Sequence, residues 1–181
     1  MDKKIVILDR DGVINVDLMT YVTKREDFEP IEGSLEAISR LNQAGYLVAI
    51  ATNQACINKG IISDAELSDI HDFLSEELKK LGGKIDFVSY CPHDYSIEGC
   101  SCRKPATGLL EDIENHFKIS VKGSYFIGDK ESDIQAALNH GCIPLLVETG
   151  YGPEAKKAIN CPPVNNCFED LYAAVNFILS S

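Results

Sequence analysis

Short, wholly apolar runs alternate along this chain with longer segments whose apolar residues recur every three or four positions. The short runs are typical of strands covered on both faces, and the longer segments are typical of amphipathic helices. Parallel strands need helical crossovers, so the alternation predicts an α/β fold with a doubly wound, mostly parallel sheet. The expected strands are 5–8, 46–51, 85–90, 125–127 and 143–147.

The expected helices lie between and after these strands. Ser34 is a candidate N-cap for a helix that stops at Gly45, and Ser63 forms a capping box with Glu66 at the start of the next. Further helices are expected at about 107–117, 132–140 and 168–179, and residues 148–167 are expected to be the least regular. A chain of 181 residues is cramped for two domains, so we expect one domain over residues 1–181.

The charge balance argues against several classes of partner. The chain has 17 basic and 28 acidic residues, a net charge of −11, whereas nucleic acids and anionic membranes attract clustered Lys and Arg. No apolar run approaches the ~18 residues of a membrane span, and the N-terminal segment lacks the features of a signal peptide. We therefore expect a cytoplasmic protein without nucleic-acid or membrane partners, and we also expect it to be a monomer.

Polar side chains end three of the expected strands, and ligands of such sheets bind at the carboxyl ends of the strands. These residues are Asp9 and Asp11, Thr52 and Asn53, and Asp129 and Asp133. A lone Asp after a strand is usually a turn or cap residue. A calcium loop of the EF-hand type needs Gly at its sixth position, whereas Gly12 is fourth from Asp9. Three strands delivering polar groups to one edge indicate a site.

Four segments resemble, in order, the motifs of the haloacid dehalogenase (HAD) superfamily of phosphohydrolases. They are Asp9-Arg10-Asp11-Gly12-Val13, Thr52-Asn53, Lys104 and Gly128-Asp129-Lys130-Glu131-Ser132-Asp133. Cys91-Pro92-His93 and Cys100-Ser101-Cys102-Arg103-Lys104-Pro105 are similar to segments of the heptose 1,7-bisphosphate phosphatases and the related histidinol-phosphatases.

This resemblance covers residues 4 to about 150 and implies a Rossmann-like core. It also implies a phosphomonoester hydrolase that removes the C7 phosphate of D-glycero-D-manno-heptose 1,7-bisphosphate, in nucleotide-heptose and lipopolysaccharide core biosynthesis. Histidinol phosphate or another small sugar phosphate is the alternative substrate.

The chemistry of a phosphatase can be assigned to the first motif. A carboxylate at Asp9 can attack phosphorus and form an aspartyl-phosphate. Asp11 can protonate the leaving alkoxide and later deprotonate the attacking water. Residues two apart in an extended segment face the same side, so both can meet one phosphoryl group.

A dianionic phosphate would be repelled by these carboxylates, which predicts a Mg²⁺ ion held by Asp9, the Asp11 carbonyl and Asp129. Groups expected to cradle the phosphoryl oxygens are Thr52, Asn53 and Lys104. The resemblance further implies that Arg103 recognises substrate and that Lys130 lies beside metal and phosphate. Asp133 is expected to orient Lys104 or a metal-bound water.

Three of the seven cysteines lie within residues 91–102. Cys91, His93, Cys100 and Cys102 are four N/S ligands of the kind that a tetrahedral Zn²⁺ site uses, although a chance pairing or a reversible disulfide is the alternative. With four protein ligands the ion would be structural. It would fix an inserted loop, 91–102, that leads into Arg103 and Lys104.

No insertion after the first motif is long enough for a separate cap domain, so residues 15–30 must line the mouth of the site. Candidate sugar contacts are Asp17, Leu18, Met19, Thr20 and Tyr21, opposite Asn53, Gln54 and Ala55. Simple loop packing is the alternative for Met19 and Tyr21. Lys59 stands where the heptose enzymes usually have Arg, and it is a candidate for the distal phosphate although it lacks the bidentate fork.

A competing hypothesis is a non-catalytic, zinc-stabilised binding module descended from such an enzyme. The intact set of Asp9, Asp11, Lys104 and Asp129 argues against it, since a binder needs no positioned carboxylate pair. Three histidines on expected helices are interpreted as non-catalytic: His71, His116 and His140.

Overall fold

The computed structural model describes residues 4–97, 99–158 and 166–181. Within these ranges six parallel strands form one sheet in the order β3-β2-β1-β4-β5-β6. The strands are β1 (Ile5–Leu8), β2 (Leu47–Asn53), β3 (Phe87–Cys91), β4 (Tyr125–Gly128), β5 (Ile143–Val147) and β6 (Cys167–Phe168). The predicted doubly wound α/β fold is confirmed.

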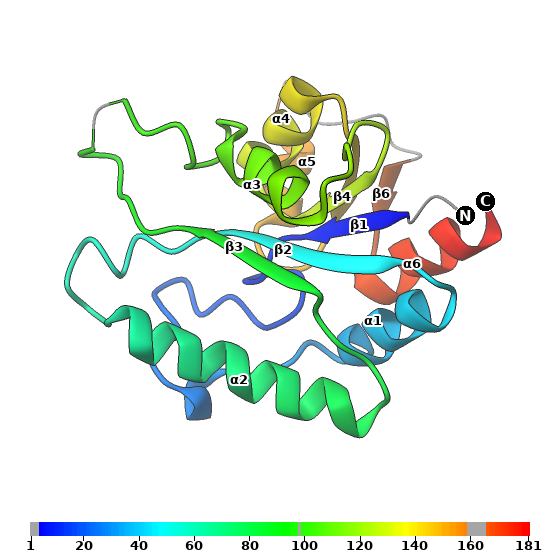
Figure 1. Ribbon diagram of the computed structural model, residues 1–181, viewed down its shortest axis with the longest axis horizontal. Coiled ribbons are helices and arrows are strands. Elements are labelled where there is room, and N and C mark those ends of the chain that lie inside the picture. The colour runs from blue at the N-terminus through cyan, green and yellow to red at the C-terminus, as the bar shows by residue number, and fades with distance from the viewer. Residues whose placement is uncertain (1–3, 98, 159–165) are drawn as a thin grey trace.

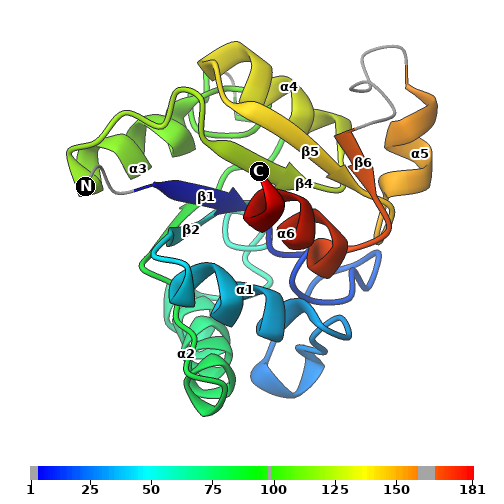
Figure 2. The same cartoon turned by 90° about the vertical axis from the view of Figure 1, so that its right-hand side faces the viewer.

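Helices cover both faces of the sheet (Figures 1 and 2). One face carries α1 (Ser34–Gln43), α2 (Asp64–Lys80) and α6 (Leu171–Ser180), and the other carries α3 (Gly108–Phe117) and α4 (Glu131–His140). Two short helices, η1 (Arg25–Asp27) and α5 (Gly152–Lys157), lie outside these two layers.

The apolar run of β1 explains why both faces are covered. Val6 and Leu8 belong to the core beneath α1, α2 and α6, whereas Ile5 and Ile7 belong to the core beneath α3 and α4. Successive side chains of a strand point to opposite faces, so a strand with no polar position needs a helical layer on each side.

Local signals predicted only some of the element ends. The strands expected at 46–51 and 85–90 run over 47–53 and 87–91, and the helix expected from 168 begins at Leu171, because Phe168 lies in β6. The capping box of Ser63 and Glu66 is present at the start of α2. The expected cap at Ser34 is wrong, because α1 begins at Ser34 itself and its hydroxyl donates to the Ile14 carbonyl at 2.7 Å. Residues 148–167 contain α5 and the first residue of β6, although 159–165 lie outside the described residues.

The sheet places one pair of strand ends side by side. From β1 the chain builds outward to β2 and β3, and from β4 it builds the opposite way to β5 and β6. The backbone N–H of Asp9, just after β1, donates to the Ile127 carbonyl of β4 at 2.9 Å. Ligands of such sheets bind where the strand order reverses, so the loops after β1 and β4 are the place to look for a site.

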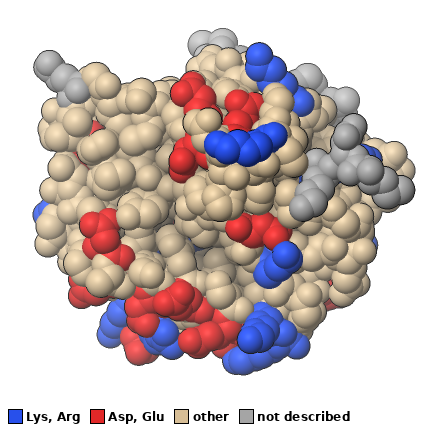
Figure 3. Space-filling model, in the orientation of Figure 1, with Lys and Arg blue, Asp and Glu red and all other residues tan. Residues whose placement is uncertain are grey.

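The face of the molecule drawn in Figure 3 carries its charges in mixed groups. On the face in Figure 3, Lys and Arg lie among Asp and Glu, most clearly along the lower edge beside α2. There Arg25 pairs with Asp69 and Glu76 at 2.6 and 3.3 Å. Among the described residues, no helix has the length and apolar character that crossing a bilayer requires.

Candidate active site

A buried lysine holds two carboxylates together at the carboxyl edge of the sheet. Lys104 Nζ lies 3.0 Å from Asp9 Oδ1 and 2.6 Å from Asp133 Oδ1, and it donates to the Ala51 carbonyl at 2.7 Å. Lys104 is only 3% exposed. Burial alone would lower its pKa, but the charges of Asp133 and Asp9 outweigh burial and raise the pKa above its usual range. The neighbouring carboxylates therefore favour the positively charged form of Lys104.

Asp129 completes a carboxylate cluster, defined here as Asp9, Asp129 and Asp133. It is 0% exposed, and a Cβ added to Gly12 or to Gly150 would come within 2.2 Å of its Oδ2 atom. Gly12 also has φ +84, a left-handed backbone that favours glycine. Glycine at both positions lets the chain close around this carboxylate.

The charge of the carboxylate cluster is incompletely balanced. Asp129 Oδ2 accepts from the backbone N–H of Tyr151 at 2.8 Å, whereas Asp129 Oδ1 is buried without a hydrogen-bond partner. Burial, then the charges of Asp9 and Asp133, raise the pKa of Asp129 to about 8. In such surroundings a further cation would favour the ionised form of Asp129.

A divalent cation fits this cluster. One carboxylate oxygen from each of its three members lies within 4.8 Å of the others. Three carboxylates face two cations, Lys104 and Lys130, which leaves a net negative charge, and Asp129 Oδ1, which has no hydrogen-bond partner, offers a ligand atom. Oxygen ligands of this kind suit a hard cation such as Mg²⁺.

Asp11 is held in place by three side chains. Arg10 Nη2 donates to both oxygens of Asp11, at 2.9 and 3.1 Å. The amides of Asn15 and Gln54 donate to it at 2.9 and 3.0 Å. Burial would raise the pKa of Asp11, but the charge of Arg10 and these hydrogen bonds lower it below its usual range. The carboxylate of Asp11 nevertheless reaches the cavity beside the cluster.

The end of β2 is joined to the segment around Lys104. Asn53 Oδ1 accepts from the backbone N–H of Lys104 at 3.0 Å, and Asn53 Nδ2 donates to the Lys104 carbonyl at 3.2 Å. Thr52 is buried, and its hydroxyl accepts from Gln54 Nε2 at 2.9 Å. The second motif therefore fixes the backbone that carries the buried lysine.

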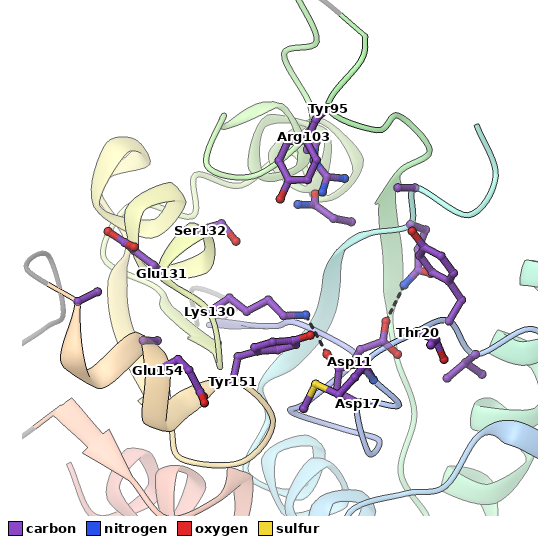
Figure 4. A pocket seen from close by; sticks show the side chains of 18 residues that line it. Asp11, Asp17, Thr20, Tyr95, Arg103, Lys130, Glu131, Ser132, Tyr151 and Glu154 are labelled. Carbon is purple, nitrogen blue, oxygen red and sulfur yellow. Dashed lines mark hydrogen bonds and ion pairs between the residues drawn. The ribbon is translucent and has the colours of Figure 1, made fainter. Parts of the chain in front are cut away.

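A cavity of about 750 Å³ opens above these groups (Figure 4). Residues expected at the site that line it are Asp11, Asp17, Met19, Thr20, Tyr21, Asn53, Gln54, Ala55, Arg103 and Lys130. Five other expected residues are buried and do not line it: Asp9, Thr52, Lys104, Asp129 and Asp133. Leu18 and Lys59 also lie outside the lining, although Lys59 Nζ donates to the Tyr21 hydroxyl at 2.9 Å.

Basic side chains approach the cavity from two sides. Lys130 reaches toward Asp17, and its Nζ lies 3.0 Å from Asp17 Oδ2. Burial alone would lower the pKa of Lys130, but the charges of nearby carboxylates outweigh burial and raise it. On the opposite side Arg103 lies 4.0 Å from the ring centroid of Tyr95 and donates to the His93 carbonyl at 2.9 Å. An elongated ligand with an anionic outer end would meet positive charge here.

Several residues that line the cavity are not predicted from the sequence. The unexpected lining residues include Tyr95, Glu131, Ser132, Tyr151 and Glu154. The sequence assigns no role to Arg10, although a charged residue two positions after a fully buried strand is a signal that points to one. Tyr95 is 88% exposed in the loop after β3, and nothing in the sequence around it marks it.

The four expected zinc ligands come together in that loop. Cys91, His93, Cys100 and Cys102 have ligand atoms within 4.8 Å of one another. Their Sγ atoms are 2.9 to 3.6 Å apart. These separations approach the roughly 3.8 Å of two thiolates on a tetrahedral Zn²⁺ with Zn–S bonds of about 2.3 Å. The four side chains could hold one metal ion with no position left open.

Comparison with known proteins identifies the family. A HAD-hydrolase-like family model matches residues 101–174. D-glycero-beta-D-manno-heptose-1,7-bisphosphate 7-phosphatase of Pseudomonas putida is 42% identical over 170 residues, which is 94% of this chain and 96% of that one. This chain belongs to the HAD-like heptose bisphosphate phosphatase family. It is a phosphatase.

Other family members agree in sequence and structure. The D-glycero-alpha-D-manno-heptose-1,7-bisphosphate 7-phosphatase of Campylobacter jejuni is 43% identical over 77% of this phosphatase and 78% of its own length. The crystal structure of D,D-heptose 1,7-bisphosphate phosphatase from B. bronchiseptica, complexed with magnesium and phosphate, superimposes with a TM-score of 0.93. It is 38% identical and covers 98% of both chains.

Proposed function

We propose that this phosphatase removes the C7 phosphate of D-glycero-D-manno-heptose 1,7-bisphosphate and supplies nucleotide-activated heptose for lipopolysaccharide core. The observation that carries the proposal is the pairing of Asp9 with the buried Lys104, at 3.0 Å, beneath a cavity of about 750 Å³ with cations at its outer end. Relatives named for the same substrate support it.

Two metals belong to the proposal. Asp9, the Asp11 carbonyl and Asp129 would hold Mg²⁺, which when bound neutralises the carboxylates and polarises the phosphoryl oxygens. The B. bronchiseptica relative was crystallised with magnesium and phosphate, which supports this choice. Zn²⁺ would be structural in the Cys/His cluster.

In the first step a carboxylate oxygen of Asp9 attacks phosphorus, and the bond from phosphorus to the sugar oxygen breaks. Arg10 and its hydrogen bonds favour the carboxylate of Asp11, so Asp11 must first take up a proton, which it then gives to the departing alkoxide so that the sugar leaves as an alcohol. Lys104, the Thr52 hydroxyl and the backbone N–H of Asn53 would stabilise the charge on the phosphoryl oxygens. The product of this step is an aspartyl-phosphate at Asp9.

In the second step water attacks phosphorus and the bond from phosphorus to Asp9 breaks. Asp11, now a carboxylate, takes the proton from that water, so inorganic phosphate leaves and both residues return to their starting forms. The strong hydrogen bonds to the Asp11 carboxylate support this second role. Asp133 would keep Lys104 aimed at Asp9.

The outer part of the cavity would recognise the rest of the substrate. The residues that we assign to sugar binding are Asp17, Leu18, Met19, Tyr21, Asn53, Gln54 and Ala55. The cations that we assign to the distal phosphate are Lys59, Arg103 and Lys130. Arg103 offers the planar fork that suits a phosphate, and the Tyr95 ring limits the directions in which it can point.

The proposal also covers the context of the enzyme. One phosphatase domain spans residues 1–181, with the zinc loop 91–102 inserted, and it would act as a monomer on a small sugar bisphosphate in the cytoplasm. The scattered surface charges support a protein without a nucleic-acid or membrane partner.

A substrate panel tests the substrate assignment. Phosphate release in Mg²⁺ would be measured for both anomers of heptose 1,7-bisphosphate, histidinol phosphate and simple hexose phosphates. We expect a heptose bisphosphate anomer to exceed histidinol phosphate in kcat/KM by at least about tenfold, a difference of about 1.4 kcal/mol in transition-state binding. A tenfold preference for histidinol phosphate would overturn the assignment, and equal release by Asp9→Asn would overturn the mechanism.

A further inference from the structure

Among the described residues, Arg10 has the largest fully buried side chain, with 0% of it exposed. A guanidinium without water must find partners for its N–H groups within the protein. Its Nε donates to Asp11 Oδ1 at 3.2 Å, and Nη2 donates to both Asp11 oxygens. One edge of the guanidinium therefore grips Asp11 through a planar fork.

The opposite edge of Arg10 meets a helix that the catalytic motifs do not include. Arg10 Nη1 lies 3.2 Å from Nε2 of His71, which α2 brings in from 61 positions away. A guanidinium can only donate, so Nε2 must accept with its lone pair and the proton of the ring must sit on Nδ1. Burial and the positive charge of Arg10 lower the pKa of His71 to about 3, so the ring is neutral at pH 7.

Without His71 the guanidinium would have one fixed edge and one free edge. Asn15 and Gln54 hold Asp11 directly, and Gln54 Oε1 lies 3.4 Å from Arg10 Nη2, but neither amide hydrogen-bonds with Arg10 Nη1. His71 is also absent from the residues that line the cavity. Its effect on the substrate must therefore pass through Arg10.

We propose that His71 is a positioning residue that locks the plane of Arg10, so that Arg10 aims the Asp11 carboxyl group at the leaving oxygen of the substrate. The inference rests on the proposed acid–base role of Asp11. The sequence alone indicates that His71 is non-catalytic. The inference gives it a role in turnover, although His71 does not contact the substrate.

The leaving group of the substrate provides a selective test. A sugar alkoxide needs a proton as it departs, whereas 4-nitrophenolate leaves readily without one. We would measure kcat/KM of His71→Leu, His71→Gln, Asp11→Asn and His116→Leu on heptose 1,7-bisphosphate and on 4-nitrophenyl phosphate. Glutamine retains an acceptor for Arg10, leucine does not, and His116 is a matched helical histidine stacked on Phe87.

We expect His71→Leu to lose roughly tenfold or more in kcat/KM on the heptose bisphosphate, a part of the 10²- to 10⁴-fold contribution of a general acid. The loss on 4-nitrophenyl phosphate should be at most about threefold, since aiming the proton donor matters less there. His71→Gln should recover most of the activity, and His116→Leu should match wild type on both substrates.

Each contrary outcome has a distinct meaning. If His71→Leu lost kcat/KM equally on the two substrates, or on neither, the positioning role would be overturned. The acid–base role of Asp11 would still stand if Asp11→Asn lost kcat/KM selectively on the heptose bisphosphate. A His71→Gln variant as impaired as His71→Leu would also overturn the positioning role. Equal losses in Asp11→Asn would remove both the acid–base role and the inference. Thermal unfolding of each variant shows whether misfolding accounts for a loss.

Discussion

The two ends of the cavity are held by different kinds of interaction. At the inner end Lys104 is buried and paired with Asp9 and Asp133 at 3.0 and 2.6 Å. At the outer end each cation lies over a tyrosine ring, although Lys130 is also paired with Asp17 at 3.0 Å. The pairs are Lys59 with Tyr21, Arg103 with Tyr95 and Lys130 with Tyr151.

This difference separates chemistry from recognition. Buried charges interact strongly and are costly to leave unpaired, so the inner end tolerates almost no change of position. A cation over an exposed ring contributes only about 0.5–1 kcal/mol and can shift with its partner. We therefore expect substitutions at the inner end to abolish turnover, and substitutions at the outer end to alter which substrates bind.

Asp9→Asn should produce the largest effect. An amide at this position cannot attack phosphorus, so phosphate release should fall by roughly 10⁴-fold or more, as it does when a nucleophile is removed from other enzymes. The assay is phosphate release in Mg²⁺ with heptose 1,7-bisphosphate. Activity within tenfold of wild type would show that the inner end does not perform the chemistry.

Lys104→Met should be next in size and should affect stability as well. Removing the cation leaves the carboxylate cluster with one fewer partner, so the free energy of unfolding should fall by about 3 kcal/mol, and kcat/KM by about 10²- to 10³-fold. Urea unfolding and steady-state kinetics measure the two effects. Lys80→Met is the matched control, because Lys80 pairs with Glu77 at the surface and should change stability by under about 1 kcal/mol.

Loss of the ion from the Cys/His cluster should have an intermediate effect. Cys100→Ser should release Zn²⁺ and reduce kcat/KM by about 10- to 100-fold, since Cys100 Sγ accepts from the backbone N–H of Arg103 at 3.3 Å. Zinc content and activity would be measured on the same samples. Added Mg²⁺ should not restore activity, and Cys142→Ala should keep its zinc. A zinc-free variant with full activity would separate this loop from the site.

Tyr95→Ala should give the smallest change. Without the ring, Arg103 is less well directed, so KM for the heptose bisphosphate should rise about two- to fivefold while kcat stays near wild type. Tyr95→Phe keeps the ring and should retain the wild-type KM. A fall in kcat rather than a rise in KM would mean that the outer end takes part in the chemistry.

Much of the fold was predictable because its determinants are local. The runs 5–8 and 143–147 are strands with the expected bounds, and the capping box at Ser63 needs only neighbouring residues. The strand-end rule likewise brought Asp9, Thr52 and Asp129 to one edge, because a parallel sheet aligns the carboxyl ends of its strands.

The remainder depends on contacts between distant parts of the chain. Ser34 looks like a cap, but its hydroxyl is taken by a carbonyl that lies 20 positions earlier in the chain. His71 and Arg10 meet only after α2 packs beside the loop that follows β1. No periodicity or motif in a single sequence encodes such a meeting, and the same holds for Tyr95 over Arg103.

The adjacency of β1 and β4 has a consequence for synthesis on the ribosome. The fourth position of the strand order is filled by a segment that emerges only after more than two thirds of the chain. Until Asp129 has left the exit tunnel, the nascent chain contains Asp9 but lacks both strand β4, which lies beside β1, and the Asp129 carboxylate. A truncated product would therefore be catalytically silent, and the newly made enzyme begins hydrolysis only when its second half has docked.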